Sequence, residues 1–500
     1  MRSERHVWGG SGWAALAMAA VAAVALAAEP KELRPPNILF ILTDDLGVND
    51  LGCYGRREHR TPHLDRLAAQ GTRFTAAYCA QPICSPSRAA IMTGKAPARL
   101  HLTTYLPGRP DCASQQVLHP AIRQEVPLEE KTLAEYLKGA GYATGCMGKW
   151  HMGGTGFGPL EQGFDFYHVG RANTVPSETE GGKGEYDLTA AAEKFIAAHR
   201  GGPFFVHLCH HTPHIPYAAK EALIAKNAGA LEPVYAAVIE TLDDTVGRLM
   251  AKLDELKLAS NTIVVFTSDN GGLHVPEGPH RRITHNAPFR AGKGFLYEGG
   301  LRIPLIVRWP GHVPAGRVVD APTVNTDWLP TLLELAGQPV PAGLDGSSIA
   351  GLLTGQGEAP ARRFFWHFPH YDNQGGRPGG AVRDGEWKLV EYYDSGQAEL
   401  YHLGTDAGET KDVASEHPDA VARLRSALAA WRESVGAQAN TPNPTFDSAL
   451  YRSIYVDIDV SRYNAATADA AMNERVLAWR KAMDGVLPRG QKPSGRKPRR

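Results

Sequence analysis

The chain has 500 residues, of which 43% are hydrophobic, and its 53 Lys and Arg residues balance its 53 Asp and Glu residues. This length exceeds one ordinary domain, and the apolar content suffices for a large core, which indicates a globular protein with more than one structural unit. The balanced charge excludes a strongly basic nucleic-acid-binding protein and a strongly acidic disordered one, and six cysteines are too few for a disulfide scaffold.

The N-terminal segment has the features of a secretion signal. A weakly positive start precedes an apolar stretch from about Trp13 to Ala28, which ends in small residues with an A-x-A-like pattern. The stretch is shorter than the ~20 residues that a membrane span needs. We therefore expect residues 1–28 to be a cleaved signal peptide, the mature chain to be exported to the periplasm or beyond, and no stable membrane span. A single membrane anchor is the alternative.

Four short apolar runs have the character of buried strands, and helical patterns lie between them. We expect strands at 37–43, 204–208, 262–267 and 303–309, and helices at 61–71, 132–140, 235–256 and 328–336. This alternation predicts an α/β fold with a large, mostly parallel sheet sandwiched by helices. Because ligands collect beyond the carboxyl ends of such strands, polar clusters that follow strands are the candidate site.

The pattern of expected elements along the chain changes near Arg362. Residues 381–390 and 399–403 look like antiparallel strands, and an amphipathic helix is expected from Pro418 to about Val435. This predicts a smaller C-terminal α+β unit at 361–440, after a larger unit at 36–360. An extension at 441–488, with a helix near 469–483, precedes a basic tail at 489–500 that we expect to be disordered. Binding of nucleic acid or another anionic polymer by that tail is the alternative.

Two of the expected strands end in acidic and amide side chains. Asp44 and Asp45 follow the strand at 37–43, and Asp269 and Asn270 follow the strand at 262–267. If they converge, their oxygens form a hard ligand set that suits Ca²⁺ or Mg²⁺ better than zinc. The alternative is that these residues only cap turns and helices.

Two further segments carry a thiol and basic groups. Cys84 stands at an expected helix entrance, with residues 89–92 as the start of the helix, and Arg88 follows one turn later; dipole and guanidinium would both favour an anion there. Lys149 and His151 are two residues apart in a strand-like piece, so their side chains would point to the same side. The alternatives are a turn with a buried Cys, and a solvated Lys beside a core His.

Two later segments carry a histidine and a lysine. His214 lies in a Thr-Pro-His-Ile-Pro sequence after the strand at 204–208. Lys293 lies between Gly292 and Gly294, which would let the backbone approach a ligand closely. Ordinary loop structure is the alternative for each segment.

Taken together and in this order, the motifs resemble those of the formylglycine-dependent sulfatases, a family of the alkaline phosphatase superfamily. The most specific element is Cys-Ser-Pro-Ser-Arg at 84–88 with Thr-Gly at 93–94, which matches the C-x-P-S-R…T-G signature of that family. The resemblance extends from about residue 36 to residue 403. It implies an alkaline-phosphatase-like fold and a sulfuric ester hydrolase.

The resemblance also implies a nucleophile and a metal. Cys84 would be oxidised to Cα-formylglycine by a separate maturation enzyme, and the hydrate of that residue would attack sulfur. Deprotonation of its second hydroxyl would then expel sulfate. The implied Ca²⁺ ligands are an oxygen of the modified Cys84 together with Asp44, Asp45, Asp269 and Asn270.

The remaining roles implied by the resemblance belong to basic residues. Arg88 would stabilise the hydrate, and Lys149 and Lys293 would bind sulfate oxygens. His214, with Lys293, would protonate the leaving alkoxide. His151 would be the base that collapses the sulfated intermediate.

Substrate selection is expected from the C-terminal region. His367 and His370 lie in a His- and aromatic-rich segment that resembles one in bacterial relatives acting on sulfated sugars, which makes them candidate substrate ligands. Core packing is the alternative for both. We expect an exo-acting carbohydrate sulfatase that also cleaves aryl sulfates. The alternatives are a phosphonate or phosphate ester hydrolase of the same superfamily and a non-catalytic sulfated-glycan-binding protein.

Overall fold

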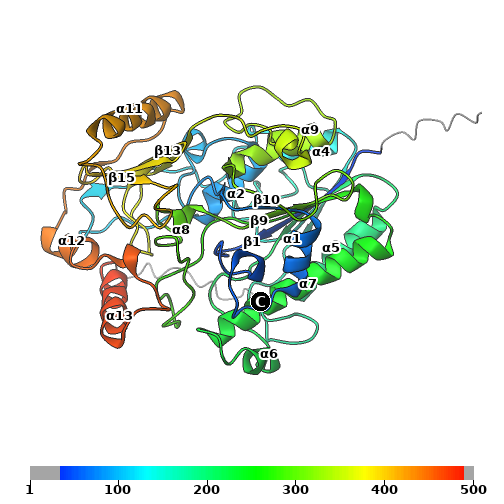
Figure 1. Ribbon diagram of the computed structural model, residues 1–500, viewed down its shortest axis with the longest axis horizontal. Helices are drawn as coiled ribbons and strands as arrows, with labels where there is room; N and C mark the ends of the chain where they lie inside the picture. Colours follow the sequence, from blue (N-terminus) through cyan, green and yellow to red (C-terminus); the bar gives the residue numbers. More distant parts are fainter. Residues whose placement is uncertain (1–33, 489–500) are drawn as a thin grey trace, which may run out of the picture. The chain divides into compact units, whose positions relative to one another are not determined.

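An eight-stranded sheet forms the centre of the fold (Figure 1). The computed structural model describes residues 34–488, so the signal peptide and the basic tail expected from the sequence lie outside the described residues. In sheet order the strands are β10 (Arg317–Val319), β2 (Thr72–Phe74), β9 (Leu305–Arg308), β8 (Thr262–Ser268), β1 (Asn37–Thr43), β7 (Phe204–Cys209), β5 (Ala143–Gly148) and β6 (Phe166–His168).

Most neighbouring strands of this sheet are parallel. The exception is β9, which runs antiparallel to both β8 and β2. Every residue of β1, β7 and β8 is buried, as expected for strands covered on both faces. The mostly parallel α/β fold predicted from the sequence is therefore confirmed, and the strand expected at 303–309 is shorter and reversed.

Helices cover both faces of the sheet (Figure 1). One layer contains α1 (Pro62–Gln70), α5 (Glu185–Ala198) and α7 (Pro233–Glu255), and the other contains α2 (Cys84–Thr93), α4 (Leu133–Gly139) and α9 (Trp328–Leu335). The start of α4 shows how local sequence sets an element. The Thr132 hydroxyl accepts the N–H of Glu135 at 3.3 Å, and the Glu135 carboxylate accepts the N–H of Thr132 at 2.7 Å.

A four-stranded antiparallel sheet forms the C-terminal part. Its strands are β12 (Phe364–Phe368), β13 (Gly379–Asp384), β14 (Trp387–Tyr392) and β15 (Ala398–His402). Helix α11 (Pro418–Ser434) packs on this sheet through Leu424 and Leu428. The predicted smaller α+β part is thus present, and the boundary expected near residue 360 falls between α10 (Ala350–Thr354) and β12; the exact domain limits stay a prediction.

The remaining elements are short or lie near the C-terminus. They are η1 (Gly52–Tyr54), β3 (Ala77–Tyr78), α3 (Pro97–Leu100), β4 (Val117–Leu118), α6 (Glu221–Lys226), η2 (Ala259–Asn261), α8 (Glu298–Leu301), β11 (Thr323–Val324), η3 (Asn325–Asp327), β16 (Thr441–Pro442), α12 (Ser448–Tyr455), η4 (Val460–Arg462) and α13 (Ala470–Gly485). Among residues 34–488, no helix combines the length and apolarity that crossing a bilayer requires.

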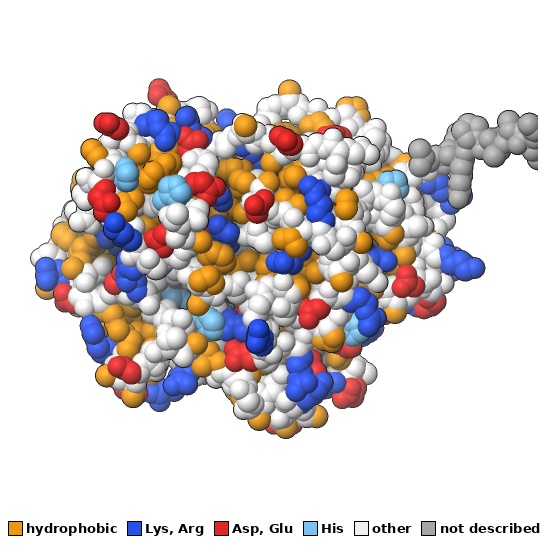
Figure 2. Space-filling model, in the orientation of Figure 1, with side chains coloured by type: hydrophobic (Ala, Val, Ile, Leu, Met, Phe, Trp, Pro, Cys, Tyr) orange, Lys and Arg blue, Asp and Glu red, His pale blue; other side chains and the backbone are white. Residues whose placement is uncertain are grey.

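The distribution of charged side chains and the state of the cysteines both agree with the expectations from composition. Figure 2 shows basic and acidic side chains interspersed over one face of the molecule, without a region of a single sign. The six cysteines all lie in the described part of the chain, and all are free thiols there. Disulfides therefore do not hold this structure together.

Candidate active site

The ends of β1 and β8 bring acidic and amide side chains together. These strands are parallel and in register at Thr43 and Ser268, so the residues that follow emerge at the same edge. The Asp45 N–H donates to Asp269 Oδ1 at 3.1 Å, and Asn270 Nδ2 donates to Asp45 Oδ1 at 2.9 Å. Within residues 34–488, the buried Asn270 Oδ1 has no hydrogen-bond partner. This set therefore keeps an unused oxygen donor.

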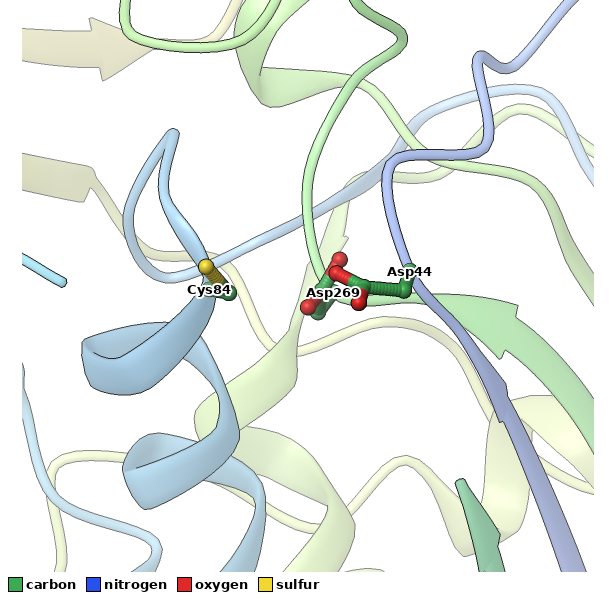
Figure 3. A group of neighbouring side chains, drawn as sticks. All are labelled: Asp44, Cys84 and Asp269. Atoms are coloured by element: carbon green, nitrogen blue, oxygen red, sulfur yellow. The ribbon is translucent and has the colours of Figure 1, made fainter. Parts of the chain in front are cut away.

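Cys84 stands at the first position of α2, close to Asp269 and Asp44 of this acidic edge (Figure 3). One ligand atom from each of Asp44, Cys84 and Asp269 lies within 4.8 Å of the other two. The helix begins at Cys84 itself, so the helix entrance expected at this residue is confirmed; the start at residues 89–92, which belonged to the alternative of a turn with a buried Cys, was wrong. Ile83 precedes the helix and offers no side-chain cap, which leaves the first N–H groups of α2 free to favour an anion.

Three cations lie against the three carboxylates. Arg88 Nε donates to Asp269 Oδ2 at 2.8 Å, because α2 presents Arg88 one turn after Cys84. Lys149 Nζ lies 2.7 and 2.9 Å from the two carboxylate oxygens of Asp44. Lys293 Nζ lies 2.7 Å from Asp45 Oδ2. The acidic and basic residues proposed from the sequence thus form one buried cluster.

Lys149 and His151 reach this region by a turn and not by strand alternation. β5 ends at Gly148, which has φ of 92°, and His151 has φ of 59° in the left-handed region. The strand-like geometry expected for this pair was therefore wrong. His151 Nε2 donates to the Leu106 carbonyl at 3.0 Å, and its buried Nδ1 has no partner in the described part of the chain.

Both histidines of the cluster are neutral at physiological pH. Burial, reinforced by the Lys149 ammonium, lowers the pKa of His151 to about 3. Burial and then Lys293 also lower the pKa of His214. His214 Nδ1 donates to the Ile215 carbonyl at 2.7 Å, which leaves Nε2 as the acceptor, 3.7 Å from Asp45 Oδ2. Each ring therefore has one free nitrogen that can take up a proton.

The carboxylates and the thiol respond differently to burial. Burial opposes ionisation of Asp44, but Lys149, together with other cations of the cluster, holds the pKa of Asp44 well below its ordinary value. At Asp269 burial prevails over Arg88 and raises the pKa. Burial also raises the pKa of the Cys84 thiol, although Lys149 and Lys293 act in the opposite sense. An unmodified Cys84 is therefore a thiol at neutral pH and not a thiolate.

The donor set fits a hard divalent cation. Carboxylate and amide oxygens are the ligands that Ca²⁺ prefers, and the unpartnered Asn270 oxygen is a further donor of this kind. The charges of Asp44, Asp45 and Asp269 are matched by those of Arg88, Lys149 and Lys293 in the described cluster. A bound dication would make the cluster net positive, which suits an anionic substrate.

The two histidines proposed as substrate ligands have protein partners. His367 is buried, with Nδ1 2.8 Å from the Tyr393 hydroxyl and Nε2 2.8 Å from the Gln438 carbonyl oxygen. His370 is also buried, and its Nε2 lies 2.7 Å from Thr103 Oγ1. These contacts favour the packing alternative for both residues.

Sequence reasoning missed two further basic residues near the cluster. Burial lowers the pKa of His211 to about 4, with Asp44 and Lys149 among its charged neighbours, and burial lowers the pKa of Lys183 to about 8. Lys183 Nζ donates to the Pro216 carbonyl at 2.8 Å. The His-His doublet directly before the Thr-Pro-His sequence was the available sign for His211, whereas no motif pointed to Lys183.

Two family models match the chain. The model described as Sulfatase matches residues 36–338, and the model described as N-sulphoglucosamine sulphohydrolase, C-terminal, matches residues 291–434. The first of these covers more than half of the chain and includes every residue of the buried cluster.

Two curated sulfatases and one solved structure are also similar to this chain over two thirds or more of its length. Arylsulfatase A of Homo sapiens is 36% identical over 423 residues, which cover 75% of this chain and 78% of that protein. N-acetylgalactosamine-6-sulfatase of Sus scrofa is 37% identical over 371 residues, covering 67% and 69%. The crystal structure of Ps i-CgsB superposes with a TM-score of 0.70 at 29% identity, covering 80% of this chain and 93% of that one.

Proposed function

This chain belongs to the sulfatase family and is a sulfuric ester hydrolase, and we propose that it removes sulfate from carbohydrates with a formylglycine derived from Cys84 and a bound Ca²⁺. The observation that carries the proposal is that Cys84, at the start of α2, has its thiol within 4.8 Å of carboxylate oxygens of Asp44 and Asp269. A nucleophile at that point would meet both a cation and the substrate sulfur.

The state of Cys84 supports oxidation to formylglycine. Its raised pKa and burial make the unmodified thiol a poor nucleophile, because the thiolate is the reactive form. The oxidised residue would supply a hydroxyl for attack on sulfur and would later release sulfate by returning to the aldehyde. We propose that a separate maturation enzyme installs this group before the site becomes active.

The acidic edge would hold the cation. Asp44, Asp45, Asp269 and Asn270 supply its protein ligands in this proposal, with the modified Cys84 completing the set. When bound, Ca²⁺ would act as a Lewis acid and as a template for one sulfate oxygen. Arg88, ion-paired with Asp269, would hold that carboxylate in place and offset charge beside the nucleophile.

The lysines and histidines would handle the substrate. Lys149 and Lys293 would bind sulfate oxygens and offset the charge that develops as the S–O bond to the alcohol breaks. An anionic ester beside His214 would raise the pKa of that ring and so favour the protonated form that donates to the leaving oxygen. His151, neutral and with a free Nδ1, would accept the proton whose loss releases sulfate.

Two of the similar proteins support a sugar as the alcohol part. One is named for N-acetylgalactosamine 6-sulfate, and the structure of Ps i-CgsB has also been solved in complex with k-i-k-neocarrahexaose. Small aryl sulfates would serve as generic substrates. The signal-like residues 1–28 support export of the mature enzyme.

Replacement of the nucleophile tests the proposal. We expect Cys84→Ala to lower turnover of 4-nitrophenyl sulfate and of N-acetylgalactosamine 6-sulfate by at least ~10³-fold with an unchanged thermal unfolding midpoint, because a covalent nucleophile is lost. Cys53→Ala, at a half-buried free thiol in η1, is the matched control and should keep parental activity. Peptide mass spectrometry should find the aldehyde at position 84 in active material only.

Two outcomes would contradict the proposal. Parental sulfate hydrolysis by folded Cys84→Ala would remove Cys84 from the reaction. Faster turnover of a matched aryl phosphodiester than of the aryl sulfate by the parent enzyme would favour a phosphoester hydrolase instead.

A further inference from the structure

The C-terminal extension, residues 441–488, lies beyond both family models, which end at residues 338 and 434. It contains β16, α12, η4 and α13. Several of its buried side chains pack against one short segment of the preceding part, residues 372–376, which we call the 372–376 turn. The extension therefore contributes contacts that the matched family regions do not include.

α13 holds the 372–376 turn by a guanidinium and by an indole ring. Arg480 is 7% exposed; its Nη1 donates to the carbonyl oxygen of Asn373, and its Nη2 donates to Asp484 Oδ1 at 2.5 Å. Gly375 has φ of 99°, and a Cβ there would lie 2.8 Å from the ring of Trp479. The extension thus covers the turn without space for movement toward it.

A second buried guanidinium holds the neighbouring peptide. Arg109 Nη1 donates to the Asp372 carbonyl at 3.1 Å and to Asn373 Oδ1 at 2.9 Å, while its Nη2 lies 3.2 Å from Met483 Sδ on α13. Two successive carbonyls of the turn are therefore bound by two arginines, and both arginines contact or belong to α13. The backbone position of the turn depends on this helix.

The opposite side of the 372–376 turn packs closely against the segment that contains Lys293. A Cβ on Gly294 would lie 2.0 Å from Asp372 Oδ2, and a Cβ on Gly376 would lie 1.9 Å from the Gly294 carbonyl oxygen. Gly294 has φ of 83°, so the two backbones meet where only glycine fits. Because packed interiors transmit displacement, a shift of the turn would move Gly294 and the adjoining Lys293.

We propose that Arg480 is a positioning residue for Lys293, and that the C-terminal extension thereby sets how the site binds sulfate. Arg480 touches no reacting group, but its guanidinium holds the 372–376 turn in place. The turn packs against Gly294 and so sets the position of that backbone. The adjoining Lys293 extends its ammonium from this backbone to the acidic edge. This inference rests on the proposed function, in which Lys293 binds a sulfate oxygen.

The test compares two arginines of the same helix in the matured full-length enzyme. For Arg480→Gln we expect KM for 4-nitrophenyl sulfate and the inhibition constant of inorganic sulfate to rise together by about fivefold, with a smaller change in kcat, a size typical of changes along packed networks. Arg475→Gln, at an exposed arginine of α13, should leave both constants unchanged. Arg480→Lys keeps a cationic donor and should restore both constants to within about twofold of the parent.

The outcomes separate this inference from the proposed function. A parent enzyme that neither cleaves 4-nitrophenyl sulfate nor is inhibited by sulfate would overturn the proposed function. A parent that does both, beside a folded Arg480→Gln with parental constants, would overturn the inference alone. If Arg480→Gln does not fold, Asp484→Ala, which removes the other partner of the guanidinium, decides in its place: a rise in both constants supports the inference, and parental constants overturn it.

Discussion

At the scale of single residues, the site depends on backbone conformations that most residues avoid. Asp45 has φ of 67° and His151 has φ of 59°, and both lie in or beside the buried cluster. Such conformations cost on the order of 1–3 kcal/mol each and persist only where the surroundings enforce them. At Asp45 the enforcing contacts are the bonds to Asp269 and Asn270. The strain places two side chains of the candidate site where a regular strand would not.

Gly148 is the residue that makes the turn to Lys149 possible, and Gly148→Ala tests this. Its φ is 92°, and a Cβ would lie 1.9 Å from the Cys209 carbonyl oxygen. We expect a loss of more than about 2 kcal/mol in unfolding free energy and a large loss of sulfatase activity. Gly141→Ala is the control, because Gly141 has φ of 84° with open space around it. Equal losses for the two variants in urea unfolding would contradict the role of the clash.

The residues that form the buried cluster could be named from the sequence, but the backbone path that brings them together could not. The order and spacing of the motifs predicted Cys84, Arg88 and Lys293 as members of the site. The acidic residues were predicted from their position at the ends of apolar runs. The left-handed turn at His151 was missed because one glycine, Gly148, does not by itself distinguish a turn from a strand that contains a glycine. The packing of Gly148 against β7, where a Cβ would meet the Cys209 carbonyl oxygen, favours the turn.

At the scale of elements, a buried ion network joins the antiparallel sheet to α8, which follows the Lys293 segment. Lys388 on β14 lies 2.8 Å from Glu298 of α8 and 2.8 Å from Glu409, and all three side chains are fully buried. The N–H of Glu298 also donates to Glu409 at 2.6 Å. The alternation of β14 predicted a strand, but no sequence pattern predicts a partner 90 residues away.

Replacement of Lys388 should weaken the attachment of the antiparallel sheet to α8. Lys388→Met removes the cation that two buried carboxylates share and leaves Glu409 without one, while Glu298 keeps Arg302. We expect the variant to lower the unfolding free energy by about 3–5 kcal/mol. Lys411→Met removes a solvent-exposed pair with Glu416 and should change stability little, because solvent screens the pair. Denaturant unfolding of both variants measures the difference. A loss at Lys388 no larger than at Lys411 would show that the network does not hold the two elements together.

At the scale of the whole molecule, the histidines divide into site residues and core residues in a way the sequence does not reveal. Composition counts 20 histidines without saying which are buried. Burial lowers the pKa to about 3 for His151, His210 and His367, and to about 4 for His119, His211, His274 and His285. The α/β fold followed from hydrophobic periodicity, whereas the burial of a polar ring depends on contacts between distant segments.

These buried rings make folding sensitive to acid. A histidine whose pKa is lower in the folded state than in the unfolded chain stabilises the fold fully above the unfolded value of about 6.5. That contribution is lost as the pH falls toward the folded value, because the unfolded chain takes up the proton first. Buried acids with raised pKa values, such as Asp372 at about 6, act in the opposite sense. The difference in unfolding free energy between the parent and a variant that lacks one histidine isolates the contribution of that ring from the contributions of the other titrating groups.

His367 is suited to that measurement because it is buried far along the chain from the acidic edge and both of its nitrogens have protein partners. At pH 8 we expect His367→Gln to be less stable than the parent by about 1–2 kcal/mol, from lost hydrogen bonds. Between pH 6.5 and 4 the parent should lose about 3 kcal/mol that the variant keeps, at about 1.4 kcal/mol per pH unit, so the gap should close and then reverse. A constant gap for His367→Gln in urea unfolding across this range would mean that the ring is solvated or already charged in the folded protein.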